Sequence, residues 1–120
     1  SLRSDGYYNV DGSFPSQFAG ISYGSGDIIG VALDLDNNKI YWYENGTLVN
    51  SGGTTVTNRL YAPGASMVGN NGISHFNFGN GFFGTTAITS AGSNGNGSLF
   101  EYDVPTGYYA LNSKNLNTYG

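Results

Sequence analysis

The chain has 120 residues, a formal net charge of −4 and only 10% charged side chains, so it is long enough for one hydrophobic core but not for two. It has only 4 Lys and Arg residues and no basic cluster, which argues against binding to nucleic acid or to an anionic membrane surface. No apolar run reaches the roughly 18 residues that span a bilayer, and the absence of Cys excludes disulfides and thiolate metal sites.

Short β-branched or aromatic runs, closed by Asn-Gly, Gly-Asn or Gly-Gly, recur along the chain and predict an all-β protein. No segment of a dozen residues shows helical periodicity. We therefore expect an antiparallel β-sandwich or barrel. The predicted strands are Tyr7–Val10, Gln17–Tyr23, Asp27–Leu35, Lys39–Tyr43, Thr47–Val49, Ala65–Val68, Ile73–Phe78 and Leu99–Tyr102.

The clearest hairpin lies in residues 26–46, GDIIGVALDLDNNKIYWYENG, which also hold half of the acidic side chains. Alternation places Val31 and Leu33 on one face of the first strand and Ala32 on the other, so both faces are largely apolar. This pattern predicts a central pair of strands covered on each side. The Asp-Asn-Asn run at 36–38 tolerates positive φ and suits a tight connection, and Asn45-Gly46 predicts a second turn, of type I′.

The carboxylates of this hairpin raise the question of a metal site. Residues 34–38, DLDNN, partly resemble a D-x-D-x-N calcium loop, but they lack its central Gly and distal Glu. We predict a hairpin turn in which the Asp34 carboxylate accepts hydrogen bonds, and no metal or other cofactor.

Catalytic patterns are equally incomplete. Residues 20–24, GISYG, match the G-x-S-x-G nucleophile elbow, and His75 and Asp34 would complete the order of a Ser, Asp and His triad. That elbow requires a helix directly after the Ser, whereas the chain here passes into a strand. We predict that His75 is an ordinary sheet residue and that the protein is not an enzyme.

Tyrosine is the stronger binding signal, because 10 of the 120 residues are Tyr and a Tyr ring with its polar tip suits an exposed contact surface. Seven of them, Tyr119 included, lie at or near predicted strand ends and turns; the alternative is that they only cover the ends of the sandwich. The candidate binding residues are Tyr7, Tyr8, Tyr23, Tyr61, Tyr108 and Tyr109.

The C-terminal part differs in character. Residues 84–98, GTTAITSAGSNGNGS, have little to bury and predict a long flexible insertion. Pro105-Thr106-Gly107 predicts a turn, and Ala110–Leu116 a helical turn that docks Leu111 and Leu116 on the sandwich. We expect a domain over residues 1–104 and a closing segment over residues 105–120.

The hairpin motif, GDIIGVALD followed by KIYWYENG, resembles the central signature of SPRY domains. The later segments YAPGASMVG and ISHFNFGNGFF resemble further strands of that family, although Phe82-Phe83 lacks the expected Pro. YDVPTGYYALNSKNL resembles the ending of SPRY-like modules in phage virion proteins. The resemblance implies a bent β-sandwich (SPRY or concanavalin-like) that binds through loops and catalyses nothing.

From this resemblance we expect a structural or adhesive module of a phage-like virion protein, such as a decoration, fibre or tail-associated domain. Its expected partners are other virion subunits in a homo-oligomeric or repeated assembly and a host-surface protein or glycan, with no nucleic acid and no membrane insertion. The alternative is a protein-interaction adaptor domain of a cytoplasmic protein. Few residues precede the signature, so we expect a fragment of a longer protein or an N-terminal sandwich edge that a neighbouring subunit completes.

Overall fold

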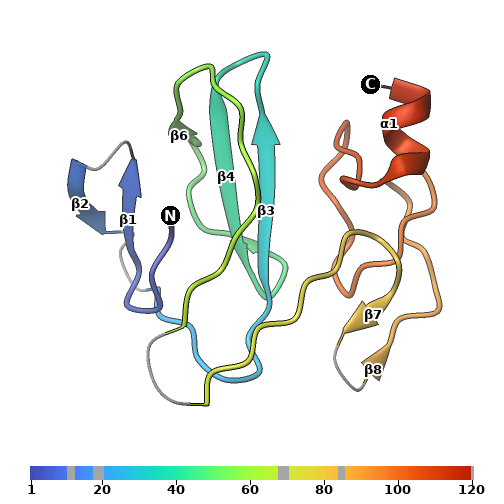
Figure 1. Ribbon diagram of the computed structural model, residues 1–120, viewed down its shortest axis with the longest axis horizontal. Helices are drawn as coiled ribbons and strands as arrows, with labels where there is room; N and C mark the ends of the chain where they lie inside the picture. Colours follow the sequence, from blue (N-terminus) through green and yellow to red (C-terminus); the bar gives the residue numbers. More distant parts are fainter. Residues whose placement is uncertain (11–12, 18–20, 68–70, 84–85, 120) are drawn as a thin grey trace. The chain divides into compact units, whose positions relative to one another are not determined.

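The computed structural model describes residues 1–10, 13–17, 21–67, 71–83 and 86–119 (Figure 1). Within them the chain is β-rich, with antiparallel pairing between its strands and one short helix. The elements are β1 Tyr7–Val10, β2 Ser13–Gln17, β3 Ile29–Asp34, β4 Lys39–Glu44, β5 Thr47–Leu48, β6 Thr54–Thr55, β7 Phe82–Phe83, β8 Thr86–Ala87 and α1 Ser113–Tyr119.

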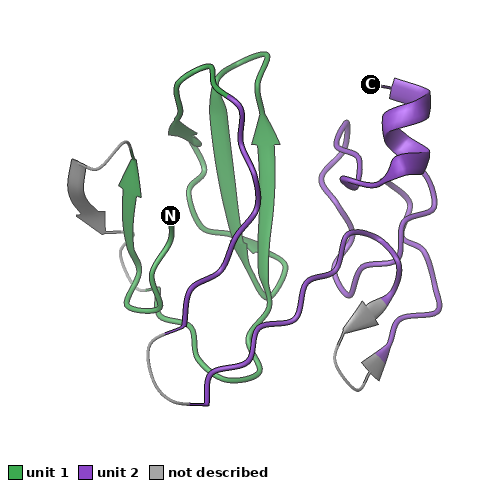
Figure 2. Cartoon of the chain, viewed as in Figure 1, with its two compact units in different colours: residues 1–59 green, residues 60–120 purple. Residues whose placement is uncertain are grey.

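The chain forms two compact units, residues 1–59 and 60–120 (Figure 2). The first unit contains β1 to β6, and the second contains β7, β8 and α1. The expected domain division at residue 104 stays a prediction.

The predicted hairpin within residues 26–46 is confirmed as β3 and β4 (Figure 1). The two strands pair in unbroken antiparallel register from Ile29 opposite Glu44 to Asp34 opposite Lys39. The following turn has φ of 47° at Asn45 and 80° at Gly46. Positive φ at both central positions is the requirement of a type I′ turn, so this prediction is also confirmed.

The strand at the centre of the sheet is β4, because β3 pairs along one of its edges while β5 and β6 pair with the two ends of the other. Between β5 and β6, the side chain of Asn50 takes the place of a paired strand. Its Oδ1 accepts a hydrogen bond from the Trp42 N–H at 2.8 Å, and its Nδ2 donates to the Ile40 carbonyl at 3.0 Å. Asn50 is buried, with 8% of its surface exposed.

The prediction that both hairpin strands are central and covered on each side is wrong for β3. Among the described strands β3 pairs only with β4, which makes it an edge strand. Ala32 is buried on one face, whereas Val31 on the opposite face is 56% exposed. A continuous apolar run shows that both faces of a strand carry few polar groups, but it does not show whether other elements cover both faces.

The buried face of the hairpin is formed by tyrosine rings packed against small residues. Gly30 lies opposite Tyr43, and Ala32 lies opposite Tyr41. The Tyr41 ring also lies against the turn before β6, where a Cβ placed on Gly53 would be 2.9 Å from two ring atoms. Gly53 has φ of 64°, so this turn requires glycine for both conformation and space.

The N-terminal hairpin consists of β1 and β2, which pair from Tyr7 opposite Gln17 to Val10 opposite Ser13. The predicted strand at Tyr7–Val10 is confirmed. The predicted strand Gln17–Tyr23 is wrong where it can be assessed: Gln17 ends β2, and residues 21–23 form no strand. Residues 18–20 lie outside the described part of the chain.

Three predicted strands in the second unit are also wrong over their described residues. Residues 65–67, 73–78 and 99–102 have no regular strand, although Leu99 makes one isolated parallel bridge to Asn80; Val68 lies outside the described residues. These segments carry apolar and aromatic residues suited to a strand, but a strand forms only where a partner satisfies its backbone groups.

The helical turn predicted for Ala110–Leu116 forms three residues later, as α1. Asn112 caps it: its Oδ1 accepts the Asn115 N–H at 3.0 Å, and its carbonyl accepts the Leu116 N–H at 2.9 Å. The predicted docking of Leu111 and Leu116 is wrong, because both are 56% exposed. The residue that α1 buries is Asn115, with 4% exposure.

The segment expected to be a flexible insertion, residues 84–98, has defined hydrogen bonds at Ile88 and over residues 93–98. It contains β8, and its last residues form a tight turn in which Asn96 and Gly97 both have positive φ. The Ser98 hydroxyl donates to the Gly95 carbonyl at 2.7 Å, and Ser98 is buried. Residues 84 and 85 lie outside the described part.

Candidate functional site

The predicted binding tyrosines of the first unit do not form one surface. Tyr7 and Tyr8 are consecutive in β1, so their side chains leave opposite faces of the strand. The Arg3 guanidinium lies 5.8 Å from the centre of the Tyr7 ring and donates to Asp5 at 2.8 Å. This face of Tyr7 is therefore occupied within the protein.

Tyr23 serves as a structural tie for the N-terminal segment. Its hydroxyl donates to the Leu2 carbonyl at 3.1 Å, and its N–H donates to the Ser4 carbonyl at 2.9 Å. Partial burial, followed by the charge of Asp5, raises the pKa of the Tyr23 hydroxyl. The hydroxyl therefore stays protonated and keeps its role as a donor.

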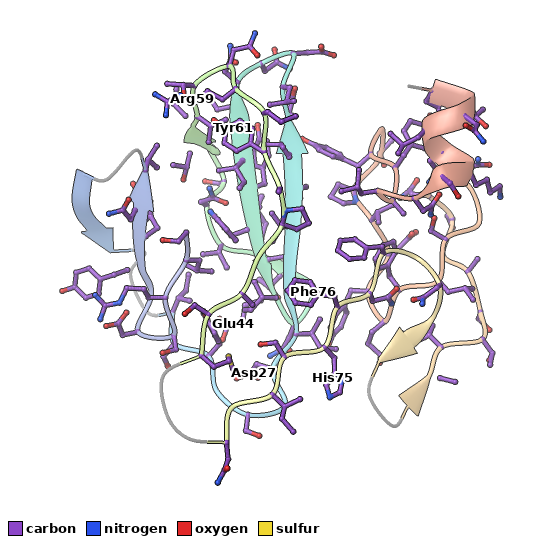
Figure 3. All side chains as sticks on the ribbon, in the orientation of Figure 1. Asp27, Glu44, Arg59, Tyr61, His75 and Phe76 are labelled. Carbon is purple, nitrogen blue, oxygen red and sulfur yellow. The ribbon has the colours of Figure 1, made fainter. Side chains whose placement is uncertain are left out.

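In the second unit, Tyr61 is 38% exposed and lies in a segment without regular structure, labelled in Figure 3. The other two predicted residues, Tyr108 and Tyr109, lie together at a hollow of about 220 Å³, joined there by Tyr119. We call this feature the tyrosine hollow. It is lined by Ser93, Asn94, Gly95, Asn96, Gly107, Tyr108, Tyr109 and Tyr119.

Two aromatic rings stack at the hollow. The ring centres of Tyr109 and Tyr119 are 3.9 Å apart, with 19° between their planes. Tyr109 is brought there by a parallel bridge to Gly95 and by the turn before it, in which the Tyr108 N–H donates to the Pro105 carbonyl at 3.1 Å. Tyr119 is the last residue of α1.

The predicted turn at Pro105-Thr106-Gly107 is confirmed by that hydrogen bond and by φ of 87° at Gly107. Positive φ at the third position of a four-residue turn favours glycine, as in a type II turn. This turn reverses the chain immediately before the tyrosine pair.

Asparagine side chains fasten α1 to the turn that forms the opposite wall of the hollow. Asn96 Nδ2 donates to Asn115 Oδ1 at 3.1 Å, and Asn115 Nδ2 donates to the Ala110 carbonyl at 3.0 Å. Lys114 Nζ donates to the Asn96 carbonyl at 2.8 Å. Because Asn115 is buried, its own two hydrogen bonds hold the wall with little competition from water.

The Asp103 carboxylate fixes the backbone of Ser93 and Asn94, which form the rest of that wall. It accepts hydrogen bonds from the N–H groups of Ser93 at 2.7 Å and Asn94 at 3.2 Å. Asn94 Nδ2 in turn donates to the Val104 carbonyl at 2.9 Å. Gly95 has φ of 74°, and a Cβ there would come within 2.7 Å of Val104, so the wall has room only for glycine at this position.

The lining of the hollow carries no charged side chain. Its titratable groups are the tyrosine hydroxyls, and desolvation, followed by the proximity of Tyr109, raises the pKa of Tyr119. The lining therefore offers aromatic surface and amide groups without a charged side chain.

The acidic groups of the central hairpin act as local braces. Asp27 accepts hydrogen bonds from the Gly24 N–H and from Asn45 Nδ2, both at 2.8 Å, and Asn45 above all lowers the Asp27 pKa. Figure 3 shows Asp27 and Glu44 at the end of the hairpin where β3 begins and β4 ends. Asp34 accepts from the Asn37 N–H at 2.9 Å and from Asn37 Nδ2 at 2.8 Å, so its predicted role in the turn is confirmed.

The described residues contain no group of three or more His, Cys, Asp or Glu side chains that could hold a metal ion. Ser22 is exposed, and the chain after Gly24 turns and enters β3 without a helix. The helix that a nucleophile elbow requires is thus missing. His75 (Figure 3) is exposed in a segment that forms no strand, so its prediction as a sheet residue is wrong.

Residues 93–96 form half of the hollow but are not recognisable in the sequence, because a run of Gly, Ser and Asn indicates a flexible loop. One signal was present: Asn96-Gly97 is a turn dipeptide of the same kind as Asn45-Gly46. Such a dipeptide indicates ordered backbone even where there is little to bury.

Comparison of the chain with models of protein families, with curated proteins and with solved structures finds no match. No helix in the described ranges combines the length and apolar character needed to cross a membrane.

Proposed function

We propose that the chain is a non-enzymatic structural or adhesive module of a phage-like virion protein, a decoration, fibre or tail-associated bead that binds protein or glycan through its loops. The proposal includes a SPRY-like β-sandwich as the complete fold, in which the hairpin of β3 and β4 contributes to the sheets. It also includes localisation on an extracellular particle. The resemblance of the hairpin and of residues 102–116 to SPRY-like virion modules is its starting point.

The observation that carries the proposal is the amount of apolar surface left open. No described side chain is fully buried, whereas Val31, Leu60, Met67 and Ile73 are among 14 large hydrophobic residues that are exposed. Exposed apolar side chains lose their unfavourable contact with water when another molecule covers them. This supports a module that acts by packing against neighbours in an assembly.

The chemistry of the surface supports binding over catalysis. Polar neutral residues and tyrosines dominate the loops, and the carboxylates Asp27, Asp34 and Asp103 are occupied by hydrogen bonds to neighbouring backbone and amide groups. A carboxylate that braces a turn is poorly placed to act as a general acid or base. Loops presented by a β-rich scaffold are, in contrast, common binding surfaces.

The test is the behaviour of the purified chain alone and with cells. Sedimentation velocity should show concentration-dependent self-association, and a fluorescently labelled chain should bind intact bacteria of at least one species in a panel. A chain that stays monomeric at all concentrations and binds no cell would contradict the proposal.

The alternative is a protein-interaction adaptor of a cytoplasmic protein. The edge position of β3 favours it, because an unpaired strand edge can accept an extended peptide as an additional strand. A peptide array decides between the two: a hit at low-micromolar affinity that is lost on mutating surface loops favours the adaptor.

A further inference from the structure

We propose that the tyrosine hollow is a carbohydrate site that accepts one neutral sugar ring, stacked on the Tyr109–Tyr119 pair. This inference rests on the proposed function, since it names the ligand class that one set of loops binds. It is carried by the size of the hollow, its aromatic wall and its amide groups.

The size and charge of the hollow limit the ligand. Its volume is about 220 Å³, below the roughly 300–1,000 Å³ of pockets that hold drug-sized molecules. One ring fits, and an extended chain must continue into solvent. No charged side chain lines the hollow. The Lys114 ammonium and the Asp103 carboxylate behind the lining already bind its backbone, so an ionic ligand would lose hydration with little gain from an opposite charge.

The aromatic wall suits the C–H face of a sugar. Tyr109 and Tyr119 cover one face of each other, yet they remain 47% and 52% exposed, so the outer face of the pair is open. An aromatic face carries partial negative charge and attracts the weakly positive hydrogens of C–H groups. The closed stack between the two rings also stiffens this platform.

The polar wall suits hydroxyl groups. Asn94 and Asn96 each use their Nδ2 in an internal hydrogen bond, to Val104 and to Asn115, and this fixes the orientation of their amides. An Asn side chain has both donor and acceptor positions beyond one such bond. Gly95 and Gly107 also line the hollow and add no side chain that would fill it. Sugar hydroxyls donate and accept, so they match this mixture.

The wall is organised before any ligand arrives. Asp103 holds the backbone at Ser93 and Asn94, and the buried Asn115 connects the opposite side to α1. A site that is already ordered avoids much of the entropy cost of binding. A proline-rich peptide is the main rival ligand, but such peptides need a groove that follows several residues, whereas this hollow is compact.

The experiment titrates the intact, ¹⁵N-labelled chain with glucose, galactose and N-acetylglucosamine, with sialic acid as the charged probe and hexaproline as the rival. We expect at least one neutral sugar to shift backbone amides of residues 93–97 and 107–109, with a dissociation constant on the order of 1–10 mM for so small a ligand. Sialic acid and hexaproline should bind at least threefold more weakly.

Three variants test the stacking. Tyr119→Ala should weaken binding of that sugar at least tenfold, whereas Tyr119→Phe, which keeps the ring, should stay within threefold. Tyr61→Ala, an exposed tyrosine of the same unit outside the hollow, should change nothing. Amide spectra that match the parent chain outside the hollow show that each variant is folded.

The proposal is overturned if no neutral sugar shifts these amides at about 50 mM, well above the affinity expected for a ligand of this size, if hexaproline or sialic acid is preferred, or if Tyr119→Ala binds like the parent chain. Its failure can be told from failure of the proposed function. Cells bound normally by Tyr119→Ala, with no sugar in the hollow, leave the module function standing and remove only this site.

Discussion

Replacement of Asn50 by Ala should strongly destabilise the first unit, although Asn50 is a polar residue near the end of a short strand. Its side chain satisfies the Trp42 N–H and the Ile40 carbonyl on β4, at 2.8 and 3.0 Å, and its Nδ2 also donates to Thr54 Oγ1 at 3.0 Å. Alanine removes all three hydrogen bonds at once, and it cannot replace the missing strand between β5 and β6.

The cost follows from the two backbone groups that lose their partner. A buried donor or acceptor left unsatisfied costs about 1–3 kcal/mol. Both groups are half-buried and can gain some water, so we take the lower part of that range and expect a loss of about 2–4 kcal/mol in the free energy of unfolding. This is a large fraction of the roughly 5–15 kcal/mol that stabilises a typical domain.

The assay uses the single Trp of the chain, Trp42, whose own N–H binds Asn50. Its fluorescence, followed in urea, reports directly on the strand in question. With a slope of about 2 kcal/mol per molar urea, the midpoint should fall by about 1–2 M.

Two further variants serve as controls for the loss of the Asn50 hydrogen bonds. Asn58→Ala removes the same side chain from an exposed position of the same unit and should change stability by less than about 0.5 kcal/mol. Asn50→Asp keeps the acceptor for Trp42 but loses the donor for Ile40, so it should be at least as harmful as Ala at neutral pH and partly recover in acid. If Asn50→Ala unfolds at the same urea concentration as Asn58→Ala, the side chain does not replace a strand.

Two other predictions concern turns. Gly53→Ala forces a side chain into positive φ and against the Tyr41 ring and should cost about 1–3 kcal/mol by thermal unfolding, whereas Gly52→Ala, which meets open space, should be nearly neutral; equal melting temperatures would contradict this. At the hairpin turn, the side-chain and then the backbone hydrogen bonds of Asn37 lower the pKa of Asp34. The stabilisation that these bonds give is complete above the ordinary Asp pKa of about 3.9. It is lost as the pH falls through the lower pKa of Asp34 in the folded chain. Carboxyl NMR titration should show the Asp34 pKa rising toward the ordinary value in Asn37→Ala, which keeps the backbone N–H and removes only the side-chain donor. An unchanged titration would exclude the Asn37 side chain as a cause.

The sequence predicted the part of the fold that depends on neighbours along the chain. β3, β4 and the turn at Asn45-Gly46 were predictable because the strands are joined by a few residues and the turn dipeptide sets the twist. The segment at residues 73–78 also carries β-branched and aromatic residues and yet forms no strand. A pattern shows what a strand would bury, but the partner that makes it a strand comes from elsewhere in the chain.

The tyrosine hollow was half predictable for the same reason. Tyr108 and Tyr109 are predictable candidates because their rings follow directly after the turn at Pro105-Thr106-Gly107. Their opposite wall depends on hydrogen bonds over long sequence separations, such as Asn96 to Asn115 and Asp103 to Ser93. Asn and Ser carry no periodic signal that would indicate such pairings.

The side-chain amide hydrogen bonds of Asn50, Asn96 and Asn115 determine how the stability of the fold responds to salt and to chemical damage. Interactions between exposed charges weaken over a screening length of about 10 Å at 0.1 M salt, whereas hydrogen bonds between neutral amides and backbone groups are hardly affected. These hydrogen bonds should therefore persist in the folded chain from low to high ionic strength. Its vulnerability is chemical, because asparagine is heat-labile, and hydrolysis of Asn96 to a carboxylate would set a negative charge beside Asn115 and open the wall that α1 now holds.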